Sequence, residues 1–435
     1  MKRMIEKAFL AWKQDPKRKI LLLRGARQVG MTYSLRELGK TFNSFVEVNF
    51  EENPEIKSFF EKSLNHLEII EKLAIYFGTA IIPGESLLFF DEIQACPEAL
   101  KSLRFFYEKI PELHVAAAGS LLELAIADLP SFGVGRIESL FMYPLTFAEF
   151  MAVTGNQKLN SLIAEASPEN PLDSIIHEKI LAKLKIFQII GGMPEVVKDY
   201  LETKDFNRCQ KQLDNLVTSW VDDFAKYKKR SPVLRLQEVF KAIVFQTGSK
   251  FKYASIADGR TESYKDVLEL LLKAGLAYKV CHTSARGLPL GAQINDKKFK
   301  ILIFDSGIYQ RIVGLNLSEY IASDLQQLIN KGHLAELFSG LELIKSGSPY
   351  SYPELYYWHR EEKSSNAEVD FVVQGKNGVV PLEVKAGTKG QMQSLHIFLD
   401  ERNLSTGIRI SAENFSRYDK IITISLYAAS RAYDI

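Results

Sequence analysis

The chain has 435 residues, of which 46% are hydrophobic and 25% are charged, and its formal net charge is +2. This composition is that of a globular protein and excludes disorder or a coiled coil as the main state, while the small net charge excludes a strongly basic nucleic-acid coat. At about 150 residues per domain, the length predicts two to four domains. Three cysteines predict free thiols in a reducing compartment. We find no signal peptide and no apolar stretch of about 18 residues, so we expect a soluble cytoplasmic protein with no membrane partner.

The first 150 residues alternate short apolar runs with helical patterns. The runs predict strands at 19–24, 45–50, 86–90, 114–118 and 137–143. Short apolar strands that alternate with helices are typical of βα units, in which a largely parallel sheet is covered on both faces. We therefore assign residues 1–155 to one α/β domain.

The rest of the chain divides into three segments. Residues 156–172 are rich in Asn, Ser and Pro and are interpreted as a linker, and residues 173–230 are helical. Residues 231–320 read as three helices followed by a two-stranded hairpin, which is the order of a winged helix. Residues 325–435 begin with a helix and continue with strands, which predicts a second α/β domain.

A glycine-bearing loop lies between the first predicted strand and the helix that follows it. Its residues fit the phosphate-loop pattern G-x-x-x-x-G-K-[ST], except that methionine stands in the lysine position. Glycines let backbone N–H groups surround phosphates, and the helix N-terminus adds partial positive charge. The loop therefore predicts a nucleotide site, in which the threonine hydroxyl would hold Mg²⁺. The residues expected to contact nucleotide are Gly25, Ala26, Arg27, Gln28, Val29, Gly30, Met31 and Thr32.

Two acidic residues end the apolar strand at 86–90. Asp91 would bind Mg²⁺ and Glu92 would orient or activate the attacking water. Ser120, after the next strand, is a candidate sensor of the γ-phosphate. Arg136 is a candidate to stabilise the transferred charge, either within its own chain or from a neighbouring subunit of a homo-oligomer. Each residue alone has an ordinary structural interpretation, so the inference rests on their joint pattern.

Methionine in place of lysine at position 31 lowers both the nucleotide affinity and the rate of hydrolysis that we expect. A hydrogen bond to a charged partner is worth about 1.5–3 kcal/mol, which is about ten- to a hundredfold in affinity. Loss of a donor that stabilises transition-state charge costs about 10²–10³ in rate. We therefore expect weak or slow nucleotide chemistry.

Six short motifs lie along the chain: RGARQVG at 24–30, FDEIQ at 90–94, AGSLL at 118–122, GR at 135–136, YPLTFAEF at 143–150 and GGMPE at 191–195. Together they resemble those of bacterial and archaeal AAA+-type ATPases that carry a C-terminal domain of unknown function. The resemblance covers essentially the whole chain and implies ATP as the nucleotide. It also implies an ATPase domain, a helical lid, a winged helix and a restriction-endonuclease-like α/β domain. Lysine is the family's residue at position 31.

A second group of acidic residues lies near the C-terminus. Alternation along two predicted strands places Glu368 and Asp370 on one face, and Glu383 and Lys385 on one face of the returning strand. Glu336, on an earlier helix, is a further acid. Neighbouring carboxylates repel one another unless they are protonated or neutralised, so Mg²⁺ is a natural ligand of this group.

Asp370 followed by Glu383-Val384-Lys385 resembles the D…E-x-K core of PD-(D/E)xK nucleases. That resemblance implies Asp370, Glu383 and Lys385 as catalytic residues, and Asp370, Glu383 and Glu336 as metal ligands. Three interpretations stay open: a polar sheet face with compensating charges, a degenerate nuclease fold that only binds nucleic acid, and an active metal-dependent nuclease.

A basic segment accompanies the predicted winged helix. Residues 222–260 hold nine basic and four acidic side chains, which favours DNA as a partner, although a solvated surface explains the same charges. The main hypothesis is an ATP-binding, DNA-associated enzyme with impaired hydrolysis. The alternatives are a nucleotide-binding switch or scaffold without turnover, and a protein-interaction regulator whose two sites are both relics.

Overall fold

The structure is a computed structural model that describes residues 1–61, 65–119, 122–127, 135–227, 230–256, 261–318, 332–360, 367–387 and 392–435. The chain forms two compact units. The first comprises Met1–Tyr143 with two later segments, Lys273–Gly275 and Ser348–Tyr352. The second comprises Pro144–Leu272, Leu276–Gly347 and Pro353–Ile435.

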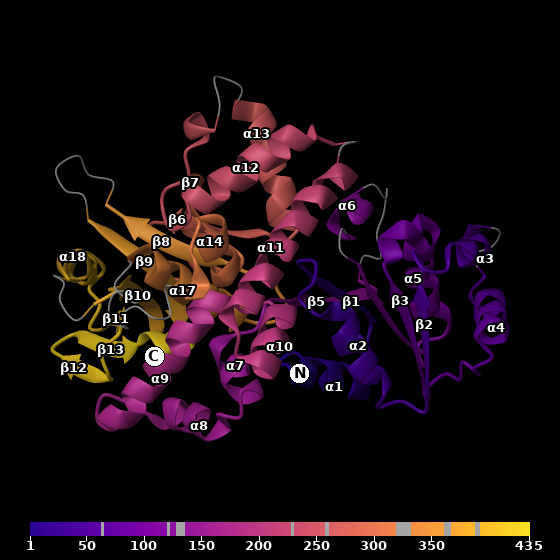
Figure 1. The fold of residues 1–435 in the computed structure, drawn as a ribbon, viewed down its shortest axis with the longest axis horizontal. Coiled ribbons are helices and arrows are strands. Elements are labelled where there is room, and N and C mark those ends of the chain that lie inside the picture. Colours follow the sequence, from indigo (N-terminus) through magenta and orange to yellow (C-terminus); the bar gives the residue numbers. More distant parts are fainter. Residues whose placement is uncertain are drawn as a thin grey trace. The chain divides into compact units, whose positions relative to one another are not determined.

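The first unit contains a parallel sheet with the strand order β2-β3-β4-β1-β5 (Figure 1). Every strand predicted in this part of the chain is confirmed, with ends that shift by at most one residue. The strands are β1 (Ile20–Gly25), β2 (Ser44–Asn49), β3 (Ser86–Asp91), β4 (His114–Ala118) and β5 (Ile137–Met142). The described helices are α1 (Glu6–Gln14), α2 (Met31–Gly39), α3 (Lys57–Glu61), α4 (His66–Phe77), α5 (Pro97–Lys109) and α6 (Leu122–Ala127).

The central strands of this sheet are apolar along their length. Leu21–Leu23 in β1 and Leu87–Phe90 in β3 are fully buried, as expected for parallel strands that are covered on both faces. The edge strand β2 instead alternates buried and half-buried side chains. Arg24 and Asp91 lie at the carboxyl ends of β1 and β3, so the two parallel strands place these polar residues at the same edge of the sheet.

The second unit contains a mixed sheet with the order β12-β13-β11-β10-β9-β8-β6-β7. Its strands are β6 (Ala277–Thr283), β7 (Ile294–Ile303), β8 (Leu355–His359), β9 (Glu368–Gly375), β10 (Gly378–Val384), β11 (Gly407–Ser411), β12 (Ser416–Tyr418) and β13 (Ile421–Ser425). Its described helices are α7 (Phe147–Val153), α8 (Gln157–Glu165), α9 (Ser174–Ile190), α10 (Pro194–Thr203), α11 (Phe206–Asp223), α12 (Val233–Phe245), α13 (Thr261–Lys273), α14 (Ser306–Ile312), α17 (Gly332–Lys345) and α18 (Gln393–Arg402). An α/β architecture with a second sheet and further helices is thus confirmed.

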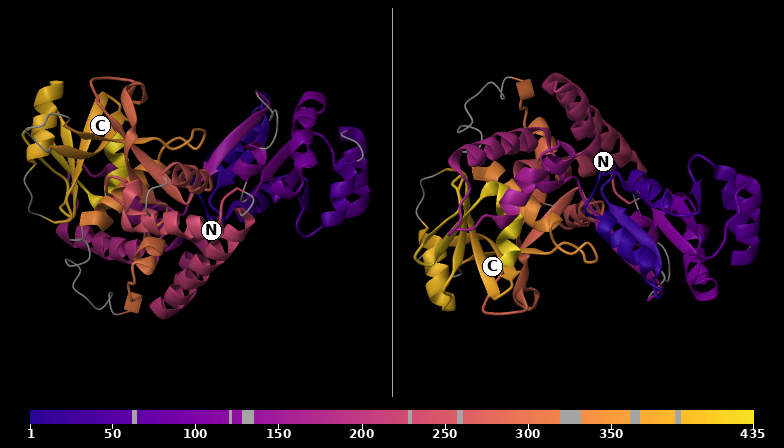
Figure 2. Two further views of the ribbon diagram at one scale, coloured as in Figure 1. Left: turned by 90° about the horizontal axis from the view of Figure 1, so that it is seen from above. Right: turned by 90° about the horizontal axis from the view of Figure 1, so that it is seen from below.

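The hairpin expected to form the wing belongs to this second sheet. β6 and β7 pair antiparallel, as a wing would, but β6 also pairs in parallel with β8. The orange hairpin therefore continues the sheet that the yellow strands form (Figure 2). The subdivision into a helical lid, a winged helix and a nuclease-like domain stays a prediction from the sequence.

The segment interpreted as a linker is partly helical. Residues 157–165 form α8, in which Leu159 and Ile163 are buried. These two residues are four positions apart and share a helix face, a signal that the surrounding Asn and Ser residues obscured. The short strand β12 and its partner β13 were also not predicted. No helix among the described residues is long and apolar enough to cross a membrane.

Two of the sequence motifs meet inside the second unit. The Leu145 amide donates to the Gly192 carbonyl at 2.7 Å, and the Gly192 amide donates to the Asp305 carboxylate at 2.7 Å. A Cβ atom at Gly192 would lie 2.3 Å from the Leu145 carbonyl oxygen. Gly192 in the GGMPE motif must therefore be glycine because the Leu145 backbone packs against it, and this residue has a structural role.

Candidate functional site

The phosphate-loop sequence forms a tight connection between β1 and α2. The strand ends at Gly25 and the helix begins at Met31. Gln28 and Gly30 adopt positive φ angles of 67° and 96°, which turn successive N–H groups toward one side of the loop. A Cβ atom at Gly25 would lie 2.3 Å from the Met142 carbonyl oxygen of the neighbouring β5. The backbone therefore has the form of an anion-binding loop.

Thr32 and Asp91 meet at the carboxyl edge of the sheet. The Thr32 hydroxyl donates to the two carboxylate oxygens of Asp91 at 3.2 and 3.1 Å. Asp91 is only 4% exposed. Burial, and then the charge of Glu92, raise its pKa to about 6. A hydroxyl and a buried carboxylate are ligands that Mg²⁺ prefers, and the ion would relieve the cost of the buried charge. These residues therefore fit the Mg²⁺ that the sequence predicts.

Glu92 is held beside this pair by its neighbour Gln94. Glu92 has a positive φ of 47°, and the Gln94 amide donates to its carboxylate. A Cβ atom at Gly119, just after β4, would collide with the Gln94 side chain. Gln94 thus packs between the ends of β3 and β4 and fixes Glu92. It is part of the FDEIQ motif, but its role was not predicted. Ser120 lies outside the described residues.

Met31 is buried, with 8% exposure. The structure does not replace the missing lysine with Arg24, because the Arg24 guanidinium contacts both carboxylate oxygens of Glu123 at 2.8 and 3.0 Å. Arg24 therefore does not supply the positive charge that a lysine at position 31 would bring to the phosphate loop.

Arg136 lies at the opposite edge of the sheet. It immediately precedes β5, its carbonyl accepts from the Ile20 amide at the start of β1, and its guanidinium pairs with Glu108. The phosphate loop follows the other end of β1. The structure therefore does not bring Arg136 to the loop of its own chain. A role from a neighbouring subunit stays a prediction.

An arginine from the N-terminal segment supports the loop. The buried Arg3 guanidinium donates to the carbonyls of Val29 at 3.0 Å and Tyr143 at 2.6 Å. No motif marks Arg3, and more than 20 residues separate it from the loop. Only the folded structure could identify it.

The raised pKa of Asp91 makes a prediction about stability. An acid whose pKa rises on folding costs no stability below its unfolded value of 3.8, and the full cost is present above about 6. Two pKa units correspond to about 3 kcal/mol. We expect Asp91→Asn to stabilise the nucleotide-free protein by up to that amount near neutral pH and by little at about pH 4.

Urea unfolding at a series of pH values measures this difference. Asp400→Asn serves as the control, because the Asp400 side chain is 74% exposed, and it should change stability little at either pH. An Asp91→Asn protein that is less stable than the parent near neutral pH would contradict the assignment of Asp91 as a costly buried charge.

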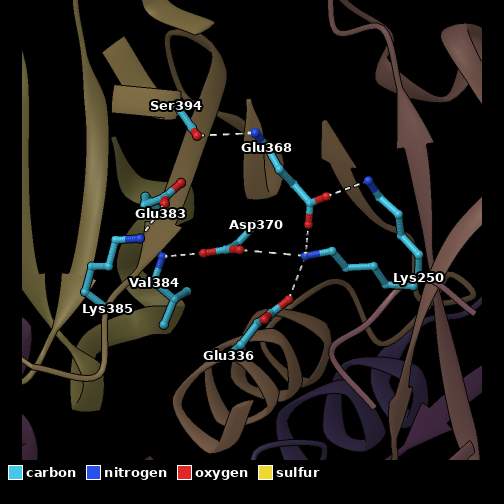
Figure 3. Close-up of polar contacts among 9 residues, drawn as sticks. Lys250, Glu336, Glu368, Asp370, Glu383, Val384, Lys385 and Ser394 are labelled. Atoms are coloured by element: carbon cyan, nitrogen blue, oxygen red, sulfur yellow. Dashed lines mark hydrogen bonds and ion pairs between the residues drawn. The ribbon is translucent and has the colours of Figure 1, made fainter. Parts of the chain in front are cut away.

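The C-terminal acidic residues lie on the antiparallel pair β9 and β10 and on α17 (Figure 3). The Val384 amide donates to the Asp370 carboxylate at 2.8 Å. Lys385 contacts Glu383 through its Nζ at 2.7 Å. The second carboxylate oxygen of Glu383, Oε2, is buried and has no hydrogen-bond partner among the described residues. The structure therefore brings Asp370, Glu383 and Lys385 together.

A buried lysine that the sequence analysis missed lies among these acids. The Lys300 Nζ atom, in β7, is 2.8 Å from Glu336, 2.7 Å from Glu368 and 3.7 Å from Asp370. Lys250 contacts Glu368 at 2.8 Å from the other side. Within the described part of the chain, no three His, Cys, Asp or Glu side chains are grouped to hold a metal ion. The expected ligand set of Asp370, Glu383 and Glu336 is thus not assembled, because an ammonium group separates Glu336 from Asp370.

Burial and charge shift the pKa values in this cluster. Burial, and then the charge of Asp370, raise the pKa of Glu336 to about 8 and that of Glu383 to about 7. Burial would lower the pKa of Lys300, but the surrounding carboxylates outweigh it and hold that pKa above its ordinary value. Burial would raise the pKa of Glu368, but its two lysine contacts lower it. The cluster therefore contains buried charge of both signs, positive on Lys300 and negative on Glu368.

Comparison with known families agrees with the geometry of the first unit. An AAA domain family matches residues 17–151. Two families described as domains of unknown function, DUF8612 and DUF4143, match residues 182–319 and 331–428. The chain therefore carries an AAA-type ATPase domain with a phosphate loop, followed by further C-terminal domains.

Individual relatives are distant. An uncharacterized protein of Methanocaldococcus jannaschii is 24% identical over 287 residues, which cover 61% of this chain and 58% of that protein. The chain thus spans a little over half the length of this relative. Among solved structures, a Walker-type ATPase of Pyrococcus abyssi is 18% identical, with a TM-score of 0.46. The aligned region covers 72% of this chain and 95% of that ATPase. The ORC1 protein of Aeropyrum pernix in complex with DNA is 11% identical, with a TM-score of 0.28. The aligned region covers 74% of this chain and 95% of that protein.

Proposed function

We propose that the first unit binds ATP with Mg²⁺ and hydrolyses it slowly. The observation that carries this proposal is the contact of the Thr32 hydroxyl with the buried Asp91 carboxylate, directly beside the loop that ends at Gly30. Backbone N–H groups of the loop would hold the phosphates, and Glu92, fixed by Gln94, would orient the attacking water. Bound Mg²⁺ would neutralise phosphate charge at Thr32 and Asp91.

Removal of the Thr32 hydroxyl tests this proposal. Thr32→Val keeps the shape of the side chain but removes one expected Mg²⁺ ligand. We expect calorimetry to show ATP binding that Mg²⁺ strengthens in the parent chain. In the variant we expect that strengthening to fall about tenfold or more, as for loss of one bond to a charged partner.

Thr41→Val is the matched control, because the Thr41 hydroxyl donates to the Leu38 carbonyl at the far end of α2. It should leave ATP binding unchanged. Absence of ATP binding in the parent chain, at any Mg²⁺ concentration, would refute the proposed nucleotide site and favour an interaction protein.

We further propose that the C-terminal cluster acts on DNA as a metal-dependent nuclease. The supporting observation is that Asp370, Glu383 and Lys385 converge while the buried Glu383 Oε2 is left without a partner. A divalent ion held by Asp370 and Glu383 would activate water or stabilise a phosphoryl oxygen. Lys385 would place its positive charge beside the phosphate that is cleaved.

The main alternative is a nucleotide-binding switch or scaffold that does not turn over. Two observations favour it: Met31 in the lysine position, and the Lys300 ammonium group among the carboxylates. ATP binding without hydrolysis, combined with DNA binding without cleavage, would support this alternative. The part of the basic segment at residues 228–229 and 257–260 lies outside the described residues.

A further inference from the structure

A short segment from late in the chain lies against the phosphate loop. This segment, Lys273–Gly275, begins at the last residue of α13 and belongs to the first unit. Gly275 has a positive φ of 73°, and a Cβ atom at this position would lie 3.0 Å from the backbone nitrogen of Ala26. Glycine therefore allows the segment to approach the loop closely.

Lys273 carries a positive charge in this segment. It lies two residues before Gly275, so the Cα atoms of the two residues are at most about 7 Å apart. The lysine side chain adds a flexible four-carbon stem that ends in an ammonium group. Because Gly275 contacts Ala26, the phosphates that the loop would hold are within reach of the Lys273 ammonium group.

The Lys273 side chain is exposed. Among the residues that the structure describes, none forms an ion pair or a side-chain hydrogen bond with it, although Glu269 lies one helical turn earlier on α13. The ammonium group of Lys273 can therefore bind a ligand without breaking a contact within the described part of the chain.

Three other basic side chains near the loop are paired with neighbouring groups. Arg24 contacts Glu123, and the Arg3 guanidinium donates to two carbonyls. Arg36, on α2, contacts Glu47 at 2.7 Å. These three arginines therefore do not replace the lysine that the loop lacks.

We propose that Lys273 contacts the outer phosphates of bound ATP and partly replaces the lysine absent from position 31. The proposal rests on the proposed ATP site and names a further residue that binds its nucleotide. The replacement is partial because Lys273 comes from a separate segment and its long, exposed side chain loses conformational freedom when it binds. A lysine at position 31 would instead extend from the first residue of α2, beside the loop.

A double-mutant cycle on ATP affinity, measured by calorimetry with Mg²⁺, tests this proposal. We expect Lys273→Gln to weaken ATP binding by about tenfold in the parent chain, as for loss of one bond to a charged partner. With Met31→Lys also present, the same substitution should weaken binding by less than about twofold, because residues that serve the same group are not additive. Lys265→Gln is the control: Lys265 is also exposed on α13 but contacts Glu262, and its removal should leave ATP affinity unchanged.

Each outcome decides a separate point. ATP binding that Lys273→Gln leaves unchanged would overturn this proposal and leave the proposed ATP site in place; a loss after Arg27→Gln would then assign the charge to the loop itself. An equal loss with and without Met31→Lys would also overturn it, because a lysine that only stabilises the end of α13 would act independently of position 31. No ATP binding by the parent chain would refute both proposals.

Chemical labelling of the parent chain gives a second measurement that needs no substitution. Mg²⁺-ATP should protect the Lys273 amine from an amine-reactive ester, as measured by mass spectrometry, and should leave the Lys265 amine as reactive as before. Equal labelling of Lys273 with and without ATP, in a protein that binds ATP, would contradict the proposal.

Discussion

Met31→Lys is expected to raise the rate of ATP hydrolysis by about 10²–10³ and ATP affinity by about ten- to a hundredfold. The lysine ammonium would supply the positive charge that the loop lacks, at the first residue of α2. The remaining parts of the site, Thr32, Asp91 and Glu92, are already assembled. Steady-state phosphate release with Mg²⁺-ATP measures the rate, and calorimetry measures the affinity.

Two further variants isolate the cause of this gain. Met31→Leu changes the side chain without adding charge and should leave hydrolysis at the parent level. Glu92→Gln, added to Met31→Lys, should abolish the gain in rate while keeping the gain in affinity, because Glu92 is expected to act on water. If Met31→Lys gained affinity but no rate, Glu92 and its partner Gln94 would not form a competent hydrolytic site.

Asp370→Asn is expected to reduce DNA cleavage by about 10²-fold or more, because it removes one of the two carboxylates assigned to the metal ion. Lys385→Ala should reduce cleavage by a similar factor without preventing metal binding. Cleavage of single- and double-stranded DNA with Mg²⁺ or Mn²⁺ measures the rates. The number of Mn²⁺ ions bound per chain, counted by electron paramagnetic resonance, separates the role of Asp370 in holding the metal ion from the role of Lys385 in cleavage.

The matched control for Asp370→Asn is Asp400→Asn in the same unit, which removes an exposed carboxylate paired with Lys420 and should leave cleavage unchanged. If cleavage by the parent chain survived both Asp370→Asn and Lys385→Ala, the nuclease assignment would be wrong. A parent chain that binds DNA without cutting it would instead favour the degenerate nuclease.

The local features of both sites could be predicted from the sequence because their residues are close together in the chain. The strand at 20–25, the loop that follows and the apolar strand ending at Asp91 carry their own signals, namely continuous apolar residues and paired glycines. Alternation along the chain likewise predicted that Glu368 and Asp370 share a face of one strand and that Glu383 and Lys385 share a face of the returning strand. In the structure these strands, β9 and β10, pair antiparallel.

The long-range features could not be predicted. Lys300 precedes Glu336 by 36 residues and Asp370 by 70, and one lysine at the start of an apolar run carries no sign of burial. Arg3 likewise carries no local sign of its burial or of its contact with the phosphate loop. Arg136 was linked to the phosphate loop by its motif alone, although sheet order and strand direction place it at the other edge. In each case the pairing of distant strands and helices, rather than local pattern, determines the contact.

The return of the chain to its first unit has a consequence for the order of folding. Gly275 packs against the backbone of Ala26 in the phosphate loop, and Pro349 accepts a hydrogen bond from Phe141 in the edge strand β5. The Gly275 contact requires residues that lie about 130 positions beyond β5, and the Pro349 contact requires residues that lie about 200 positions beyond it. At about 5–20 residues per second, the second contact is delayed by roughly 10–40 s. During synthesis the first unit therefore remains incomplete until most of the chain has emerged, and a product that ends before Gly275 would lack the contact with Ala26 in the phosphate loop.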